Sequence, residues 1–346
     1  MTALAPDLTA ALPAFPDPAD ARVYDDAFAL VGNTPLVRIN RVAPDAAAAV
    51  YVKLDQFNLG GSSKDRIGIN IVREAIASGQ LRPGQRIVDF GAGNTAIGYA
   101  LAGQATGHPV TIVANPTLSP EKANLLLLLG VDIVPGRSDV PAGHPDHWAA
   151  ISERYEQEDP SNWWARQESA TSNPHSHALS TGPEIWAQTG GRVTHFLAAV
   201  ATGGTVSGTG AYLKSQNPDV QVIATDFAEK ADKTNARAYI ERRPGYEQLE
   251  RDFPANYDLD VIDRLETRTK ADVIAFGWEV ARTEGLLLGT SSILSLLAAL
   301  DIARDAAPDD VIVSFAADSG RDYLTREYNA GWLRENGFAA VADRFA

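Results

Sequence analysis

Short runs rich in β-branched residues alternate along the chain with longer stretches that have the apolar spacing of helices. We predict as strands AVYVKL (49–54), QRIVDF (85–90), PVTIVA (109–114), VDIVP (131–135), THFLAAV (194–200), QVIATDF (221–227) and DVIVSFAA (310–317). Segments predicted as helices include 64–79, 96–107, 119–130 and 269–285. This alternation is typical of βαβ units and predicts an α/β protein with a mainly parallel sheet.

In such sheets, ligands bind in the loops beyond the carboxyl ends of the strands. Loops rich in glycine, serine and threonine are GAGNTA (91–96), ATGGTVSG (201–208), LGTSS (288–292) and ADSG (317–320). The first, second and fourth of these directly follow predicted strands. We therefore predict a binding site at these loops.

The chain has 346 residues, enough for two lobes with buried cores, and a formal net charge of −14. This charge disfavours nucleic acid and anionic membranes as partners, because both would repel the protein. The most apolar stretch, LLLLLG (125–130), is shorter than the roughly 18 residues that span a bilayer, and we predict it as a buried helix end.

The chain has no cysteine, which excludes disulfides and thiolate metal sites. GHPDH (143–147) matches no strong metal motif, so we expect no metal site. The N-terminus carries acids and prolines and does not resemble a signal peptide. We expect residues 1–25 to form a flexible arm and the protein to be cytoplasmic.

The loop ATGGTVSG offers backbone N–H groups at a predicted helix start and contains no lysine or arginine. Such an arrangement can bind a phosphate dianion through amides and the helix dipole. Taken alone, the loop is equally compatible with a plain tight turn. It differs from the pattern GxxxxGK[ST], and GAGNTA does not match GxGxxG, so nucleotide hydrolysis and nicotinamide dinucleotide binding are disfavoured.

The motifs that occur in order are VGNTPLVRIN (31–40), GGSSKDR (60–66), GNT (93–95), HALSTGPEIW (177–186), ATGGT (201–205), EGLLLGTSS (284–292) and ADSGRDYL (317–324). In this combination the sequence closely resembles the fold-type-II pyridoxal-phosphate (PLP) enzymes of the cysteine synthase and cystathionine β-synthase family. The resemblance implies a two-lobed α/β fold, similar to tryptophan synthase β, with a mainly parallel sheet in each lobe. It divides the chain into a large PLP-binding domain (26–48 plus 155–346) and a small mobile domain (49–154).

Carried over by position, the resemblance makes Lys64 the catalytic lysine, which holds the cofactor as a Schiff base. It places Asn94 near the phenolic oxygen of PLP and Ser319 near the pyridine nitrogen. It assigns the phosphate to Thr202, Gly203, Gly204 and Thr205, and the substrate to Gly91, Ala92, Gly93, Thr95 and Gln167. Taken singly, Lys64 could be a solvated helix start, Ser319 a helix N-cap and Gln167 a surface glutamine.

PLP acts as an electron sink, while the protein orients it and selects the reaction. A lysine displaced by the substrate's amine is positioned to remove the α-proton. A serine beside the pyridine nitrogen would not keep that nitrogen fully protonated, which favours loss of a β-leaving group over transamination. The resemblance thus implies β-replacement on serine, O-acetylserine or O-phosphoserine through a bound 2-aminoacrylate.

The second substrate would be a nucleophile, and the product cysteine or a related β-substituted amino acid. Three alternatives stay open: condensation of the cystathionine β-synthase type, β-elimination by a dehydratase or desulfhydrase, and a catalytically silent binding scaffold. By resemblance we expect a homodimer.

Several positions depart from the family pattern. Gly91 and Ala92 stand where Thr-Ser is usual, which removes two hydroxyl donors expected near the substrate carboxylate. Glu168 stands in place of a common aromatic residue and could attract an amine-bearing substrate or point into solvent. Ile293 replaces a glycine, and the glycines expected near 248–250 are absent. If the donor is phosphorylated, cations that could meet the leaving group are Lys230, Lys233, Arg237, Arg242 and Arg243.

Overall fold

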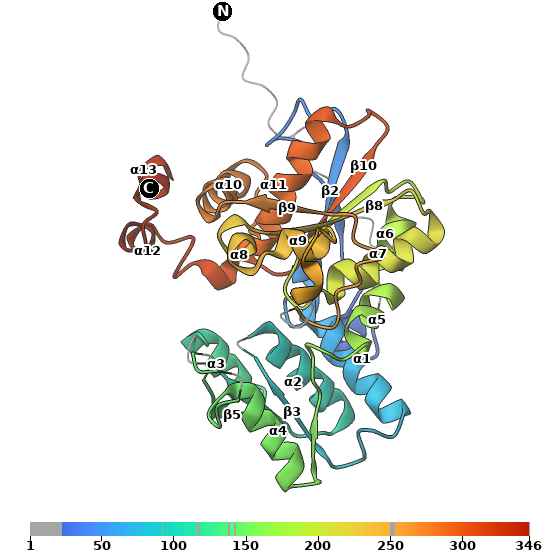
Figure 1. The fold of residues 1–346 in the computed structure, drawn as a ribbon, viewed down its shortest axis with the longest axis vertical. Coiled ribbons are helices and arrows are strands. Elements are labelled where there is room, and N and C mark those ends of the chain that lie inside the picture. Colours follow the sequence, from blue (N-terminus) through green and yellow to red (C-terminus); the bar gives the residue numbers. More distant parts are fainter. Residues whose placement is uncertain are drawn as a thin grey trace, which may run out of the picture.

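The computed structural model describes residues 23–91, 93–115, 118–137, 139–141, 143–249 and 253–345. Two lobes are visible, one built around a six-stranded sheet and one around a four-stranded sheet (Figure 1). Most of the predicted N-terminal arm, residues 1–22, lies outside the described residues. The two-lobed α/β architecture predicted from the sequence is confirmed.

The larger sheet has the strand order β1-β2-β10-β7-β8-β9, and all its neighbours are parallel except β1 and β2. Its strands are β1 (Leu36–Arg38), β2 (Ala49–Leu54), β7 (His195–Ala199), β8 (Gln221–Phe227), β9 (Arg264–Arg268) and β10 (Val311–Ala316). Both faces are buried. Leu197 of β7 packs into one core cluster, whereas its neighbours Phe196 and Ala198 pack into the other. This explains the continuous apolar run that predicted the strand.

Helices cover both faces of this sheet. The helices of this lobe are α5 (Ser172–Leu179), α6 (Thr181–Gln188), α7 (Gly204–Gln216), α8 (Ala228–Thr234), α9 (Ala236–Ile240), α10 (Lys270–Thr283), α11 (Thr290–Asp305), α12 (Ala330–Glu335) and α13 (Ala339–Phe345). The last two pack with α10, away from the sheet (Figure 1). Val280 of α10 and Leu296 of α11 share a core with Leu197, while Ile185 of α6 and Leu213 of α7 pack on the opposite face. Short 3-10 helices are η3 (Ala27–Leu30), η4 (Asp55–Phe57), η5 (Tyr246–Gln248) and η7 (Gly320–Tyr323).

The smaller sheet is wholly parallel, with the order β5-β4-β3-β6. Its strands are β3 (Arg86–Phe90), β4 (Val110–Ala114), β5 (Asp132–Pro135) and β6 (Asn162–Trp164). The helices of this lobe are α1 (Lys64–Ala77), α2 (Asn94–Thr106), α3 (Pro120–Leu128) and α4 (Trp148–Glu158). Ile67 and Ile71 of α1 share its core with Ile87 and Ile112 of the sheet.

All predicted strands are present, with ends that differ by one residue at most. The sheets, however, do not divide at the predicted domain boundaries. β2 lies within the predicted small domain, yet it pairs with β10 in the larger sheet. β6 lies within the predicted large domain, yet it pairs with β3 in the smaller sheet. The chain therefore crosses to the small lobe after β2 and returns after β6. The mobility of that lobe stays a prediction.

The prediction that 125–130 forms a buried helix end is wrong. Leu126 is fully buried, but Leu125, Leu127 and Leu128 are 37%, 59% and 83% exposed. The reason is that α3 lies on the surface of the small lobe, so only one of its faces meets the sheet. None of the described helices is long and apolar enough to cross a membrane.

Candidate active site

Lys64 begins helix α1, and the loop before it is fastened to the end of β10. The N–H of Ser63 donates to the carbonyl of Ala317 over 2.8 Å, and Ser62 forms an isolated β-bridge with Asp318. Because these partners directly follow β10, two predicted site segments from distant parts of the sequence meet at this point. The predicted catalytic lysine therefore lies beside the loop that carries Ser319.

Glycines allow the backbones of α1 and α2 to touch. A Cβ atom added to Gly68 would lie 2.4 Å from the carbonyl carbon of Gly98, and one added to Gly98 would lie 2.3 Å from the carbonyl oxygen of Lys64. Any larger residue would push the helices apart. This contact fixes the start of α2, where Asn94 is located, relative to Lys64.

Burial lowers the pKa of Lys64 from its ordinary value. The carboxylates of Asp318, Asp55 and Asp65 act against this shift, whereas the ammonium group of Lys122 adds to it. The burial effect outweighs the carboxylates. A lysine with a lowered pKa has more of its amine in the neutral form, which is the nucleophilic and basic form.

Asn94 is clamped between two charged side chains. Its Nδ2 donates to Oδ2 of Asp318 over 2.9 Å, and its Oδ1 accepts from Nζ of Lys122 over 2.8 Å. Lys122 also pairs with Asp322 at 3.2 Å, and the hydroxyl of Tyr323 donates to Asp318 over 3.0 Å. An ammonium group can only donate and a carboxylate only accepts, so these neighbours fix which way the amide faces.

Lys122 and Asp318 were not predicted as site residues. Asp318 belongs to the ADSG loop, and its position in that predicted binding loop could have indicated it as a site residue. Lys122 follows a helix N-cap at Ser119, whose hydroxyl accepts from the N–H of Lys122 over 3.3 Å. Nothing local to that helix start indicates that its lysine reaches the site.

Thr95 and Gln167, both predicted to bind substrate, meet directly, because the hydroxyl of Thr95 donates to Oε1 of Gln167. The N–H of Gln167 donates to Oδ2 of Asp89 over 3.1 Å. Nδ2 of Asn256 donates to the carbonyls of Gln167 and Glu168. Partial burial raises the pKa of the Glu168 carboxyl, and Asp89 raises it further. Gln167 is thus a buried structural junction rather than a surface glutamine.

The predicted substrate loop between β3 and α2 is only partly described. Gly91 follows β3, Gly93 is the N-cap of α2, and Ala92 lies outside the described residues. Gly93 has φ of +151°, which favours glycine, and no side chain caps the first turn of α2. The backbone N–H groups at this helix start are therefore open to an anionic group.

The predicted phosphate loop depends on two glycines. Gly203 is left-handed, with φ of +84°, and is the N-cap of α7. A Cβ atom added to Gly204 would lie 2.0 Å from Oδ1 of Asn173, a fully buried residue of α5. Nδ2 of Asn173 donates to the hydroxyl of Thr202 over 3.1 Å, and its Oδ1 has no hydrogen-bond partner among the described residues. The contacts of Asn173 thus hold the loop against α5, and the backbone amides of the loop lie at the start of α7.

A buried histidine supports the same loop. His177 is 0% exposed, with Nδ1 2.8 Å from the hydroxyl of Thr181 and Nε2 3.1 Å from the hydroxyl of Thr205. Burial is the main cause that lowers the pKa of His177 to about 3, so its ring is neutral. A neutral imidazole has one ring hydrogen, so His177 donates to one of these two hydroxyls and accepts from the other. In either case the ring of His177 holds the hydroxyl of Thr205 in place at the loop.

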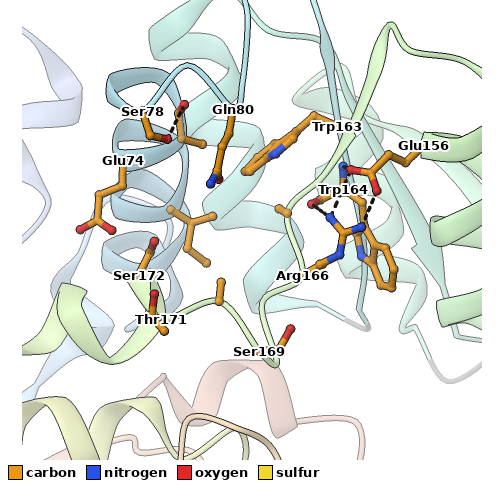
Figure 2. A pocket seen from close by; sticks show the side chains of 14 residues that line it. Glu74, Ser78, Gln80, Glu156, Trp163, Trp164, Arg166, Ser169, Thr171 and Ser172 are labelled. Atoms are coloured by element: carbon orange, nitrogen blue, oxygen red, sulfur yellow. Dashed lines mark hydrogen bonds and ion pairs between the residues drawn. The ribbon is translucent and has the colours of Figure 1, made fainter.

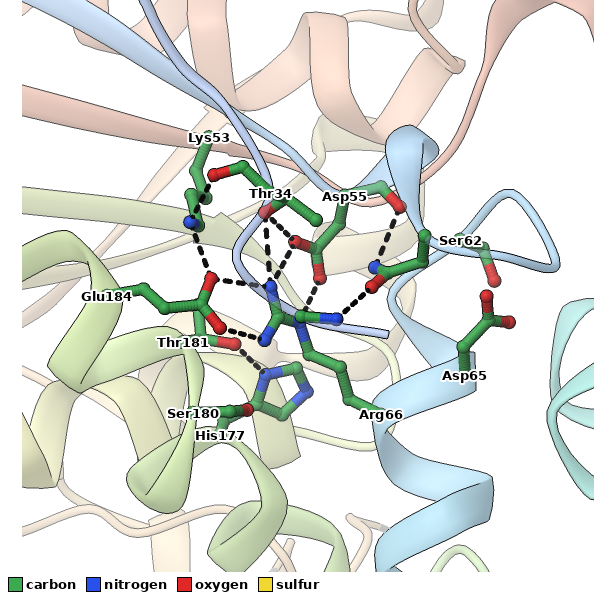
Figure 3. Close-up of polar contacts among 12 residues, drawn as sticks. Thr34, Lys53, Asp55, Ser62, Asp65, Arg66, His177, Ser180, Thr181 and Glu184 are labelled. Atoms are coloured by element: carbon green, nitrogen blue, oxygen red, sulfur yellow. Dashed lines mark hydrogen bonds and ion pairs between the residues drawn. The ribbon is translucent and has the colours of Figure 1, made fainter. Parts of the chain in front are cut away.

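A network of buried charges anchors α1 below the site (Figure 3). Arg66 donates to both carboxylate oxygens of Asp55 and to both of Glu184, over 2.6–2.9 Å. Nζ of Lys53 pairs with Glu184 at 2.6 Å and donates to the carbonyl of Thr34 over 2.7 Å. The two cations balance the two carboxylates, so the buried cluster has no net charge. It links α1, β2 and α6 into one unit.

Ser319 has the role of an N-cap, since its hydroxyl accepts from the N–H of Arg321 over 3.3 Å. It also lines a cavity of about 490 Å³, together with Gly60 and Lys122. Its contact with a pyridine nitrogen stays a prediction.

A larger cavity of about 770 Å³ lies elsewhere, between α1 and residues 163–172 (Figure 2). Its wall includes Trp163 and Glu74 but none of the predicted site residues. Nearby, Arg166 is placed over the ring of Trp164 and pairs with Glu156. Size alone would therefore select the wrong cavity, and the clustered chemistry identifies the site.

The described residues fit PLP. The start of α7 presents amides and the hydroxyls of Thr202 and Thr205 without any lysine or arginine in the loop, which suits a phosphate dianion. Nδ2 of Asn94 has two hydrogens and gives one to Asp318, so one donor is left for a phenolic oxygen. Lys64 supplies an amine with a lowered pKa.

Comparison with known proteins supports this interpretation. Residues 27–318 match the family described as "Pyridoxal-phosphate dependent enzyme". A probable cysteine synthase from Bacillus subtilis is 34% identical over 307 residues, which cover 86% of this chain and 95% of that protein. A cystathionine β-synthase from Apis mellifera is 31% identical over 92% of this chain, but only 64% of that protein is covered.

Among solved structures, O-acetyl serine sulfhydrylase isoform 3 from Entamoeba histolytica superimposes with a TM-score of 0.80 and 29% identity. The match covers 96% of this chain and 99% of that one. Sequence and fold thus agree over nearly the whole length. The chain belongs to the pyridoxal-phosphate-dependent enzymes and is a β-substituting enzyme of the cysteine synthase family.

Proposed function

We propose that this enzyme replaces the β-substituent of serine, O-acetylserine or O-phosphoserine with a nucleophile and forms cysteine or a related β-substituted amino acid. The observation that carries the proposal is the position of Lys64, a lysine with a lowered pKa beside Asn94 and the 317–320 loop. The similarity to a probable cysteine synthase and to an O-acetyl serine sulfhydrylase supports it.

Each part of the site has a distinct task in this proposal. Bound PLP supplies an electron sink for the electron pair that is freed at Cα. Lys64 takes the α-proton on Nζ, which its lowered pKa favours. The amide of Asn94 and the hydroxyl of Ser319 orient the cofactor ring. Thr95 and Gln167 hold the substrate.

Condensation of the cystathionine β-synthase type is the second candidate. The similarity to proteins of that name extends over 92% of this chain. The two reactions differ only in the nucleophile, which is sulfide in one case and homocysteine in the other. β-Elimination would follow if no nucleophile reached the site.

The test is to load the purified protein with PLP and to supply each donor with sulfide or with homocysteine. Cysteine, cystathionine and pyruvate are then measured separately. Lys64→Ala should lower turnover by at least about a thousandfold, because it removes both the cofactor's covalent anchor and the base. Lys64→Arg keeps the charge and should be equally inactive.

If pyruvate were the sole product, the reaction would be β-elimination and not β-replacement. Turnover in Lys64→Ala close to the wild-type rate would overturn the role of Lys64. A folded wild-type protein that binds PLP but changes no donor would leave the binding-scaffold alternative.

We also propose that the protein acts in the cytoplasm as a homodimer, without nucleic acid or membrane partners. The net charge of −14 supports the latter part. Exposed apolar side chains such as Phe57, Leu127 and Leu128 support self-association. Light scattering in solution should give the mass of two chains, and the mass of a single chain at micromolar concentration would contradict the dimer.

A further inference from the structure

Lys122 brings a positive charge into the site from the first turn of α3. Its Nζ donates to Oδ1 of Asn94 over 2.8 Å and lies 3.2 Å from Oδ2 of Asp322. The side chain is only 19% exposed, whereas that of Asp322 is 37% exposed. The ammonium group is therefore held between the two lobes and is partly shielded from solvent.

The ammonium group also lies over the substrate loop. A Cβ atom added to Gly93 would be 2.9 Å from Cδ of Lys122 and 3.2 Å from its Nζ. Gly93 is the N-cap of α2, and no side chain caps the N–H groups there. Gly91 and Ala92 have no hydroxyl to offer an anion. A helix start and a cation thus adjoin at a loop without side-chain donors.

The charges around Lys64 show why a cation is needed. Asp318, Asp55 and Asp65 all act on Lys64, and Asp55 is already paired with Arg66. Oδ1 of Asp318 is buried and has no hydrogen-bond partner among the described residues. Burial raises the pKa of Asp65 to about 7 and also raises the pKa of Asp318, which shows that these sites disfavour further negative charge. A substrate carboxylate brought close to Lys64 would therefore need a cation to receive it.

We propose that Lys122 binds the carboxylate of the amino-acid substrate, and that Asp322 holds this ammonium group until the substrate replaces it. The inference rests on the proposed amino-acid substrate and names the residue that recognises its carboxylate. The cavity of about 490 Å³ beside Lys122 and Ser319 gives the exchange room.

The cations of residues 229–262 do not offer the same contact. Lys230 pairs with Asp226 at 2.9 Å, and Arg237 pairs with Glu241 at 2.8 Å. Arg242 and Arg243 likewise pair with carboxylates of their own region. Lys122 is instead bonded to a residue of the site itself.

The test compares a ligand that has the carboxylate with one that lacks it. L-Alanine and L-alaninamide are titrated into the PLP-loaded protein by calorimetry, since neither has a leaving group to be lost. In Lys122→Met, the affinity for L-alanine should fall about tenfold, while that for L-alaninamide should change less than twofold. Cofactor affinity and melting temperature are measured for each variant, so that misfolding is recognised.

Asp322→Asn distinguishes substrate binding from a purely structural role. It releases Lys122 from its resident carboxylate and should strengthen L-alanine binding by about two- to fivefold. A structural ion pair would instead make Asp322→Asn as harmful as Lys122→Met. Lys233→Met, at an exposed position of α8, is the matched control and should bind both ligands as the wild type does.

Equal losses for acid and amide in Lys122→Met would overturn the inference, and so would weaker L-alanine binding in Asp322→Asn. A wild-type protein that does not prefer the acid to the amide would overturn it as well. The proposed function has its own contradicting result. It is wrong if the carboxylate is recognised in this way but no serine derivative is converted.

Discussion

The two ends of the proposed active site are built in different ways. The phosphate end, residues 202–205 with Asn173 and His177, consists of backbone amides and buried neutral groups within the large lobe. The carboxylate end, residues 91 and 93–95 with Lys122, lies in the small lobe. There the amide of Asn94 reaches Asp318 and the ammonium group of Lys122 reaches Asp322, both in the large lobe.

This difference suits the two ligands. A cofactor phosphate stays bound through every cycle, so a fixed loop with prearranged N–H groups serves it well. A substrate must enter and leave, and a partly exposed ion pair can exchange partners at little cost. We therefore expect damage to the phosphate end to abolish cofactor binding, and loss of Lys122 at the carboxylate end to alter substrate recognition.

The largest effect is expected at the phosphate end. In Gly204→Ala, the new methyl group would lie 2.0 Å from Oδ1 of Asn173, which is fully buried. We predict a loss of about 2–3 kcal/mol in the free energy of unfolding. PLP affinity should fall at least about thirtyfold, which equilibrium dialysis can measure. Gly143→Ala is the control, because nothing lies within 4 Å of its added Cβ atom. Wild-type PLP affinity in Gly204→Ala would contradict this account of the loop.

His177→Asn should have a smaller effect that is specific for the phosphate. The loss of the contact to Thr205 should weaken PLP binding about tenfold and leave binding of pyridoxal, which has no phosphate, unchanged. His175→Asn is the control on the same helix, because His175 is exposed and contacts Glu74. Equal losses for PLP and pyridoxal would show that His177 only stabilises the fold.

The smallest predicted effect is a pH dependence of stability. His177 has a pKa of about 3 in the folded protein and about 6.5 when unfolded, so only the unfolded chain takes up a proton between these values. The stability that comes from burying the neutral ring of His177 is fully present above pH 6.5 and is lost as the pH falls. From pH 7 to pH 5.5 the wild type should lose about 1 kcal/mol that His177→Asn does not lose. The difference in the free energy of unfolding between the wild type and His177→Asn should therefore narrow. A difference that stays constant in denaturant titrations would contradict the prediction.

The proposed phosphate end could be recognised in the sequence because its two glycines stand together in one segment, residues 203–204. Gly203 has a left-handed backbone conformation, and Gly204 packs directly against Asn173. Each of these constraints favours a glycine at its position. The position of Lys64 followed from the resemblance, and the strands followed from their continuous apolar runs. The glycines and the apolar runs can each be recognised within one short segment of the sequence.

At the proposed carboxylate end, Lys122 and Asp318 could not be predicted, because their contacts join distant residues. Asn94 bonds to Lys122, 28 residues away, and to Asp318, 224 residues away. No local pattern records such pairs. For the same reason, the apolar run at 125–130 was taken as buried, although Leu127 and Leu128 lie on the open face of α3. Short edge strands such as β6 have too few residues for a periodic signal.

The central claim is that Lys64, and not the nearby Lys122 or the buried Lys53, holds the cofactor. Reduction of the PLP-loaded protein with borohydride, followed by digestion and mass spectrometry, fixes the pyridoxyl group on whichever lysine carries it. The account predicts one modified site, Lys64, in the peptide that contains GGSSKDR. A pyridoxyl group on Lys122 or Lys53, or a protein that retains none after reduction, would contradict it.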